Sequence, residues 1–321
     1  MGFDRNAASD MAFGHKPVLL EECLTALHIK PDGVYVDGTL GRAGHSVEIA
    51  KRLTGGGRLI CLDRDETAIA AAKVRLADYM DRVTLVHSKF SRLGEVLAEL
   101  GVSGADGMLF DLGVSSPQLD EAQRGFSYMH DAPLDMRMDQ TAALTARDVV
   151  NGWSYEELRR ILFEYGEERY APAIAKAIVH RRQEAPIEAT GQLAEIIRQA
   201  MPAAALREKQ HPAKRSFQAI RIAVNDELGE LPPMLKAAAE QLHTGGRLAV
   251  ISFHSLEDRI IKKTLQELAT GCTCPPNFPV CVCGKKPKMK LISRKPITAG
   301  EAELVYNPRA RSAKLRVAEK L

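Results

Sequence analysis

The chain has 321 residues, of which 45% are hydrophobic and 26% are charged. This composition is typical of a folded globular protein, and the length allows a large core or more than one domain. The sequence has no apolar run long enough to span a bilayer, and its first residues lack the basic and apolar regions of a signal peptide. We therefore expect a cytoplasmic protein with no membrane partner.

Charge is distributed unevenly along the chain. From Gly284 to the C-terminus there are 11 Lys or Arg and 3 Asp or Glu, a net charge of +8. Because the whole chain carries +3, the remainder carries −5. A basic tail on an acidic body indicates a polyanionic partner such as nucleic acid, although a solvated basic surface has the same composition. A second basic group contains Arg181, Arg182, Arg207, Lys209, Lys214 and Arg215.

Strand and helix patterns alternate through the first third of the chain. We expect strands at 34–36, 58–62, 83–86 and 108–110, with helices at 44–53, 67–79 and 93–100. Such alternation predicts an α/β fold, in which a parallel sheet is covered by helices on both faces.

The alternation stops after Gln118, and a helical pattern occupies about 138–215, where Ser154 and Glu157 fit a capping box. The sheet pattern then returns. We expect a helix at 235–242, a turn at 245–246, a strand at 247–253, a helix opened by Ser255 and Asp258, and edge strands at 289–293 and 315–318. This predicts a discontinuous domain of residues 13–137 and 216–321, a helical insertion at 138–215, and a disordered segment at 1–12.

A glycine-rich segment, Asp37-Gly38-Thr39-Leu40-Gly41-Arg42-Ala43-Gly44-His45, joins the first expected strand to the first expected helix. Its glycines allow close backbone approaches that are typical of loops binding nucleoside cofactors. A dinucleotide loop reads Gly-x-Gly-x-x-Gly and receives a pyrophosphate, whereas here a carboxylate precedes more widely spaced glycines. Asp37 disfavours a pyrophosphate and suits the cationic S-adenosylmethionine, although an ordinary strand–helix turn has a similar composition.

Two residues after the next strands extend this candidate site. Asp63 ends the second strand, where a carboxylate can bind both ribose hydroxyls of an adenosine. Its alternative role is to cap the following helix, for which Asp65 is better placed. Phe90 follows the third strand and is a candidate to pack on the adenine ring, although taken alone it fits the core better.

The fourth strand leads into Asp111-Leu112-Gly113-Val114-Ser115-Ser116-Pro117-Gln118. Ligands of open parallel sheets bind beyond the carboxyl ends of the strands. Asp111 is therefore a candidate to accept a hydrogen bond from an amine that attacks a methyl group, and Gln118 to contact cofactor or base. A turn in which Asp111 caps a helix is the alternative. His254, just past a later strand, is a further candidate to face the substrate, with Ser255 as a helix cap.

The six cysteines fall into two groups. Cys23 and Cys61 lie in apolar contexts and are expected to be buried thiols. Two Cys-x-Cys pairs surround a proline-rich turn, and an extended backbone would allow their thiolates to meet as in a structural zinc site. The common zinc spacing is Cys-x-x-Cys, so a loop without metal fits as well, whereas disulfides are not expected in a reducing cytoplasm. These pairs are Cys272, Cys274, Cys281 and Cys283.

Segments spread over the chain resemble the bacterial 16S rRNA cytosine-N4 methyltransferases, the RsmH or MraW family. They are residues 15–20, 37–46, 111–118, 124–127, 133–138, 165–169, 217–221, 252–258 and 307–312. The resemblance implies a Rossmann-like class I S-adenosylmethionine methyltransferase sheet with an inserted helical domain. It also implies methylation of N4 of a P-site cytidine in the decoding centre of 16S rRNA, within the small ribosomal subunit, which tunes decoding.

The resemblance also implies cofactor-binding residues by position: Ala43, Gly44, His45, Asp63, Phe90, Asp111 and Gln118. Ala43 stands where many relatives have glycine. Two other functions remain open, a methyltransferase acting on an amino group of another RNA or of DNA, and a non-catalytic ribosome-assembly factor that binds the cofactor. The three carboxylates Asp37, Asp63 and Asp111 argue against the second. The sequence is compatible with a homodimer but does not fix the oligomeric state.

Overall fold

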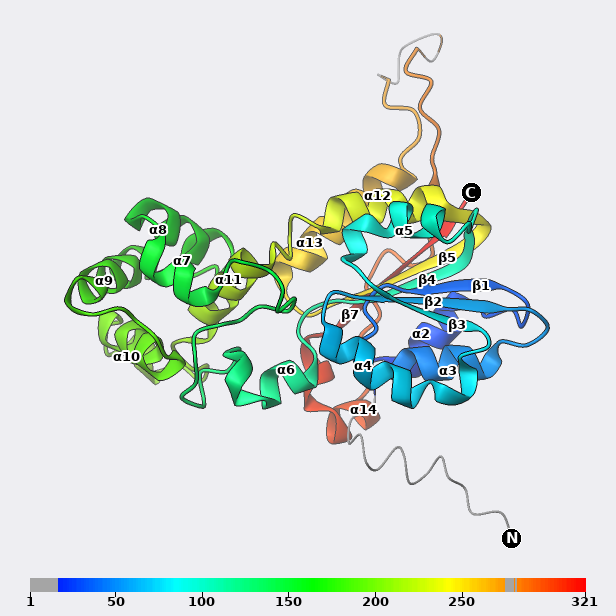
Figure 1. Ribbon diagram of the computed structural model, residues 1–321. Coiled ribbons are helices and arrows are strands. Elements are labelled where there is room, and N and C mark those ends of the chain that lie inside the picture. Colours follow the sequence, from blue (N-terminus) through cyan, green and yellow to red (C-terminus); the bar gives the residue numbers. More distant parts are fainter. Residues whose placement is uncertain (1–16, 275–279, 281) are drawn as a thin grey trace. The chain divides into compact units, whose positions relative to one another are not determined.

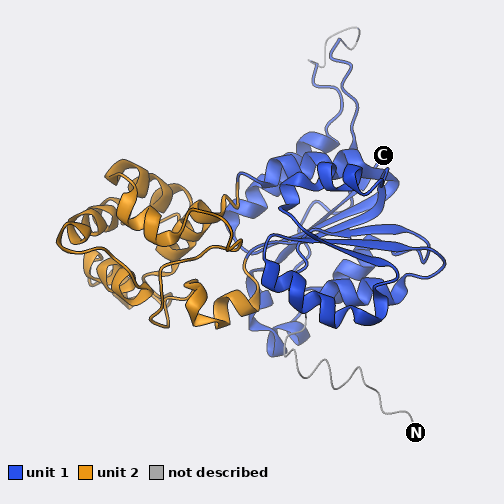
Figure 2. Ribbon diagram, in the orientation of Figure 1, with its two compact units in different colours: residues 1–113, 229–321 blue, residues 114–228 orange. Residues whose placement is uncertain are grey.

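A computed structural model describes residues 17–274, 280 and 282–321. The chain divides into two compact units (Figures 1 and 2). An α/β unit comprises the residues up to Gly113 together with Gly229–Leu321, and a helical unit comprises Val114–Leu228. The expected disordered segment at 1–12 lies outside the described residues.

The α/β unit contains a seven-stranded sheet in the order β3-β2-β1-β4-β5-β7-β6. The strands are β1 Val34–Asp37, β2 Arg58–Asp63, β3 Val83–His87, β4 Ala105–Asp111, β5 Leu242–Ser252, β6 Met289–Leu291 and β7 Lys314–Lys320. β1 to β5 pair in parallel, and β7 lies antiparallel between β5 and β6. This confirms the predicted parallel sheet with an antiparallel edge.

Helices cover both faces of this sheet. Figure 1 shows α2, α3 and α4 on one face, and α5, α12 and α13 on the other. Their bounds, with the remaining helices of the unit, are α2 Leu20–Leu27, α3 Gly44–Arg52, α4 Glu66–Arg75, η1 Ala77–Tyr79, η2 Phe90–Arg92, α5 Leu93–Glu99, α12 Leu231–Gln241, α13 Ser255–Ala269, α14 Glu301–Tyr306 and η5 Pro308–Ser312. In the described part of the chain, no helix is long and apolar enough to cross a membrane.

Two local predictions in this unit are wrong. The turn expected at Gly245-Gly246 is an irregularity inside β5, because Leu242 already pairs with Ala105 before Arg247 pairs with Gly107. The cap of α13 is also displaced by one residue. His254 and Glu257 form the capping box, in place of Ser255 and Asp258. Asp258 instead accepts hydrogen bonds from β7, from Arg316 Nε at 2.6 Å and Lys314 Nζ at 3.2 Å.

The helical unit is built around one hydrophobic core. The predicted helical spacing is confirmed, since Leu158, Ile161 and Leu162 are all fully buried in it. Ser154 and Glu157 form the predicted capping box at the start of α8. The helices are α6 Ser116–Asp120, η3 Ala122–Arg124, α7 Ala146–Gly152, α8 Tyr155–Glu164, α9 Ala171–Glu184, α10 Thr190–Ala200, η4 Ala205–Arg207 and α11 Lys214–Asn225.

This unit is wider at both ends than the predicted insertion at 138–215. The segment before residue 138 has no helical period, but hydrogen bonds with Asn225 attach it to the helical unit. Asn225 accepts a hydrogen bond from Met138 N and donates one to Met136 O, both at 2.8 Å. At the other end α11 continues past 215 and buries Phe217 and Ile220 in the same core. The unit boundaries therefore move to 113 and 229.

Candidate active site

Three carboxylates end three neighbouring strands of the α/β unit. Asp37 ends β1, Asp63 ends β2 and Asp111 ends β4, with β1 paired between the other two strands. Because all three strands are parallel, their carboxyl ends lie at one edge of the sheet. The structure therefore brings together the acidic residues that the sequence singles out, at the edge where ligands of such sheets bind.

The glycine turn crosses this edge between β1 and α3. Gly38 N donates to Leu109 O at 2.9 Å, and Gly41 N donates to the Asp63 carboxylate at 2.8 Å. A Cβ at Gly38 would lie 2.1 Å from Cε1 of Phe110, and one at Gly44 would lie 2.5 Å from Cγ of Pro17. These glycines are therefore required by close packing inside the protein, a reason that the sequence motif alone does not reveal.

Ala43 occupies a left-handed backbone conformation, with a φ of 59°, directly before α3. An L-residue adopts this region at a cost of about 1 kcal/mol, which glycine avoids. This explains physically why glycine suits the position. The alanine side chain is fully buried, so its packing offsets part of that cost.

Asp37 is buried and braces the turn. Its Oδ2 accepts a hydrogen bond from Ser46 Oγ at 2.6 Å, and its Oδ1 accepts one from Thr39 N at 3.1 Å. Burial raises the pKa of Asp37 to about 6, although both hydrogen bonds oppose this rise. Ser46 is a site residue that the sequence reasoning missed, because a serine in the first turn of a helix is not by itself distinctive.

Asp63 accepts backbone hydrogen bonds on both oxygens, from Gly41 N at 2.8 Å and from Asp65 N at 2.9 Å. Burial raises its pKa. Asp65 caps α4 by accepting from Thr67 N, as predicted, so Asp63 is not needed for that task. Each oxygen of a carboxylate can accept more than one hydrogen bond, so Asp63 keeps capacity for ligand hydroxyls.

Asp111 is held at the centre of the site. Its backbone N donates to Thr39 Oγ1 at 2.5 Å. Within the described residues, its buried Oδ1 has no hydrogen-bond partner. Burial raises the pKa of Asp111 to about 8, and the nearby charges of Asp37 and Glu257 add to the effect. A buried polar atom without a partner is costly, so it marks a position where a ligand group fits.

His45 lies next to Asp111, with Nδ1 3.8 Å from Oδ2 of the carboxyl group. Burial lowers the pKa of His45 to about 4, so the imidazole is neutral at pH 7. Its Nε2 lies 3.0 Å from Val18 O, which assigns the proton to that nitrogen. The contact with Asp111 is therefore not an ion pair, and neither group neutralises the other.

Phe90 is half-buried in η2 and packs edge-on against Phe110, with ring centroids 6.2 Å apart. The Arg64 guanidinium lies 5.5 Å from the Phe90 centroid, and Arg64 in turn forms a buried ion pair with Glu230. Lys89 Nζ is 3.3 Å from the same carboxylate. The Phe90 ring is thus fixed on one side and partly accessible. The ion pairs of Arg64 and Lys89 with Glu230 are not predicted from the sequence.

Gln118 and His254 both cap helices. Gln118 belongs to the helical unit, where its Oε1 accepts from Ser115 N at 2.9 Å to form the capping box of α6. In the α/β unit, His254 Nδ1 accepts from Glu257 N at 3.4 Å at the start of α13. Capping accounts for much of the geometry of both side chains, and their contacts with ligands stay predictions.

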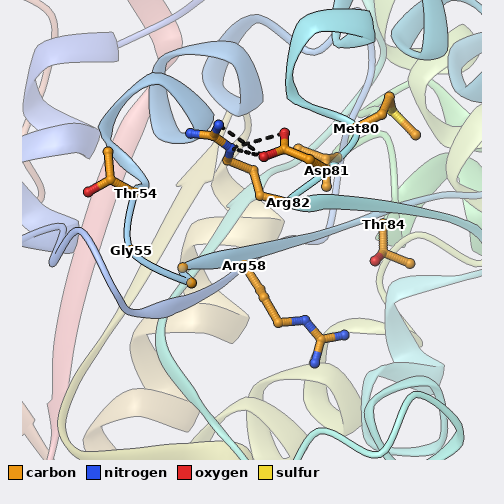
Figure 3. Close-up of a pocket in the computed structure, with 10 residues that line it drawn as sticks. Thr54, Gly55, Arg58, Met80, Asp81, Arg82 and Thr84 are labelled. Carbon is orange, nitrogen blue, oxygen red and sulfur yellow. Dashed lines mark hydrogen bonds and ion pairs between the residues drawn. The ribbon is translucent and has the colours of Figure 1, made fainter.

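A surface pocket lies at the opposite edge of the sheet, near the starts of β2 and β3 (Figure 3). It is lined by residues 54–58 and 80–84. Arg82 points its guanidinium toward Asp81 and donates to Leu53 O at 2.5 Å. Asp81 is the single acidic residue among those that line this pocket, and it is paired with Arg82. The pocket therefore has no group of carboxylates like the one at the other edge of the sheet.

The fold and site define a Rossmann-like class I methyltransferase, with a glycine turn after β1 and acidic residues after β1, β2 and β4. A family model described as the MraW methylase family matches residues 12–321, and the chain belongs to this family. It is 60% identical over 315 residues to the "Ribosomal RNA small subunit methyltransferase H" of Paenibacillus sp. (strain JDR-2), covering 96% of this chain and 100% of that protein.

A second relative with the same name, from Brevibacillus brevis, is 57% identical over 311 residues, covering 97% of this chain and 99% of that protein. Among solved structures, an rRNA methylase from Streptococcus thermophilus aligns with a TM-score of 0.40 at 10% identity, over 100% of this chain and 99% of that one. This structural similarity is too remote to add to the family assignment.

Proposed function

We propose that this protein transfers a methyl group from S-adenosylmethionine to the RNA of the small ribosomal subunit. The observation that carries the proposal is the buried Oδ1 of Asp111, which has no partner among the described residues and lies at the edge shared with Asp37 and Asp63. The names of the relatives support the substrate class. An acceptor without a partner beside two further acids suits a ligand that brings N–H groups and positive charge.

Each cofactor contact follows from a residue already placed in the α/β unit. Asp63 accepts hydrogen bonds from the ribose hydroxyls, and the accessible side of Phe90 packs on the adenine. The backbone of Ala43, Gly44 and His45 lines the turn, and Asp37 adds negative charge near the cationic groups. Gln118 belongs to the helical unit, and its role as a cofactor contact is implied by the family resemblance alone.

The reaction needs positioning more than activation. S-adenosylmethionine, when bound, supplies a methyl group that its sulfonium already activates. An exocyclic amine of cytosine is a poor nucleophile, because its lone pair is delocalised into the ring. Asp111 accepts a hydrogen bond from this amine, which orients the nitrogen and stabilises the positive charge that grows on it. Because His45 is neutral, it does not offset the negative charge that Asp111 carries once the cationic cofactor has displaced its proton.

The finer target that we propose is N4 of a P-site cytidine in the decoding centre of 16S rRNA. The family resemblance carries this step, and a base in a structured RNA must be unstacked to reach such a site. Another amino group in RNA or DNA is the alternative. Labelled methyl transfer to small-subunit particles from a strain lacking this protein tests the proposal. Large-subunit particles are the control, and equal or absent labelling of both would contradict it.

The affinity for S-adenosylmethionine is expected to rise with pH between about 6 and 8. The pKa values of Asp111 and Asp37 are about 8 and about 6 without ligand. Below these values a cationic ligand must displace a proton, which weakens binding by up to about tenfold per pH unit. Calorimetry should detect proton release. The pH dependence of affinity should be smaller for S-adenosylhomocysteine, which lacks the sulfonium charge. An affinity for S-adenosylmethionine that does not change with pH would contradict the proposed role of Asp37 and Asp111.

The basic tail is expected to contact RNA phosphates. Replacing Lys285 and Lys286 by Gln should reduce the number of counterions released on RNA binding by about two, roughly one for each lysine that neutralises a phosphate. The slope of log affinity against log salt should become shallower by the same number. The matched control replaces Lys73 and Lys236, which are exposed on α4 and α12. Plots of log affinity against log salt compare the two double variants, and identical slopes would exclude the tail as a phosphate-binding surface.

A further inference from the structure

An extension of the α/β unit between α13 and β6 brings three cysteines together. These cysteines are far in sequence from the three carboxylates of the candidate active site. The chain leaves α13 after Ala269 and returns to β6 at Met289. Figure 1 shows this segment as a projection with two legs. The legs are joined at their base, where Lys288 N donates to Leu268 O at 2.8 Å. Cys272 and Cys274 lie on the outgoing leg and Cys283 on the returning one.

The three sulfur atoms have the spacing of a metal site. Their Sγ atoms all lie within 4.8 Å of one another, and those of Cys272 and Cys283 are 3.7 Å apart. Tetrahedral zinc with Zn–S bonds of about 2.3 Å requires sulfur–sulfur separations of about 3.8 Å. A disulfide would require a separation of about 2 Å, so this geometry is that of ligands around a shared centre.

The surroundings of the cysteines favour thiolates. The backbone N–H groups of Val282 and Cys283 donate to the sulfur of Cys274. Six Lys or Arg and no Asp or Glu occur between Thr270 and Gly300, so the local charge is strongly positive. Cationic surroundings and donated N–H groups both stabilise a thiolate, which is the form that binds metal. Cys23 and Cys61, in contrast, are buried in the core, and burial raises the pKa of each thiol.

The described residues of the extension have little of the hydrophobic packing that normally holds a hairpin. Val280 and Val282 are 70% and 73% exposed. Exposed valines contribute little burial, so a small projection of this kind is usually fixed by a metal or a covalent link. A metal between the two legs would supply that link above the base.

We propose that Cys272, Cys274 and Cys283 bind a structural zinc ion as thiolates. Three thiolates select zinc over the hard cations magnesium and calcium, and each releases its proton on binding. Cys281 lies outside the described residues. The ion holds the two legs of the projection together. It thereby orders the basic residues between Thr270 and Gly300, where no Asp or Glu occurs. The use of that surface for RNA rests on the proposed function, but zinc binding itself does not.

The test is metal analysis of the full chain, produced without a histidine tag in zinc-supplemented medium. We expect about one zinc per chain in the wild type and less than about 0.1 in the Cys272→Ser/Cys274→Ser/Cys283→Ser variant. Thr273→Ser is the matched control within the same leg and should keep the zinc. Chelation should expose these thiols to alkylation, and cobalt substitution should give thiolate charge-transfer absorption.

Several outcomes would overturn the proposal: zinc near zero in the wild type, undiminished zinc in the triple variant, iron in place of zinc, or a Cys272–Cys283 disulfide in peptide mapping. The cysteines lie outside the hydrophobic core, so the triple variant should still unfold cooperatively. Because the readout is metal content, failure here is distinguishable from failure of methyl transfer.

Discussion

Asp111→Asn is expected to lower the rate of methyl transfer by about 100-fold while it stabilises the ligand-free protein at pH 8 to 9. The amide keeps the shape of the side chain but cannot carry the negative charge that stabilises a positively charged nitrogen. Stopped assays with labelled cofactor measure the first effect, and thermal unfolding without ligand measures the second.

The sign of the stability effect follows from the raised pKa. In the folded state Asp111 titrates at about 8, whereas its ordinary value is 3.8. The folded state therefore binds a proton more tightly than the unfolded state, and this group costs increasing stability as pH rises from about 4 to 8. Asparagine removes the cost, so the gain should be on the order of 5 kcal/mol at pH 9 and near zero at pH 4.

Asp106→Asn is the matched control, since Asp106 lies on the same strand at its other end. Hydrogen bonds from Val34 N and from Lys30 lower the pKa of Asp106, and Lys30 Nζ donates to its Oδ1 at 3.1 Å. Its replacement should leave methyl transfer unchanged and should destabilise the protein slightly above pH 4. Full turnover in Asp111→Asn, or a loss of stability at pH 9, would remove Asp111 from the proposed role.

Gly38→Ala is expected to destabilise the α/β unit by about 3 kcal/mol, the largest loss of stability that the site predicts. Its Cβ would lie 2.1 Å from Cε1 and 2.5 Å from Cδ1 of Phe110, whose side chain is fully buried. Displacement of Phe110 would also disturb Phe90, which packs against it. Denaturant unfolding measures the first effect, and weaker cofactor binding should accompany it.

A double-mutant cycle identifies the cause. Phe110→Leu makes room for the added methyl group, so it should recover part of the stability lost in Gly38→Ala, giving a favourable coupling energy. Gly94→Ala controls for the effect of replacing a glycine where there is room. Gly94 lies within α5, and a Cβ there would meet only Gln241 Nε2, at 4.0 Å. It should raise stability by about 0.5–1 kcal/mol. Wild-type stability in Gly38→Ala would contradict the packing account.

The sheet and its acidic edge could be predicted because strong local signals determine them. Short apolar runs alternate with helical periods, and a carboxylate after a buried strand is a distinctive pattern. Asp37, Asp63 and Asp111 therefore share one edge as soon as the strands are parallel. Their hydroxyl partners, Thr39 and Ser46, could not be predicted, since such residues are common in every turn.

Tertiary contacts explain the predictions that were wrong or displaced. The segment before residue 138 has no periodicity, and its place in the helical unit depends on the buried amide of Asn225, far away in sequence. Serine is a favoured helix cap, which predicts Ser255 as the cap of α13, whereas His254 takes that position in the structure. The glycine pattern predicts that Gly38 and Gly44 approach a ligand, and the structure shows that they approach Phe110 and Pro17.

We propose that this site methylates an exocyclic cytosine amine of small-subunit RNA. The most direct measurement is nucleoside analysis of 16S rRNA after small-subunit particles from a strain lacking this protein are incubated with the purified enzyme and labelled S-adenosylmethionine. We expect the label in N4-methylated cytidine, and we expect Asp111→Asn to lower its amount by about 100-fold. Label in another nucleoside, or no label in the RNA, would contradict it.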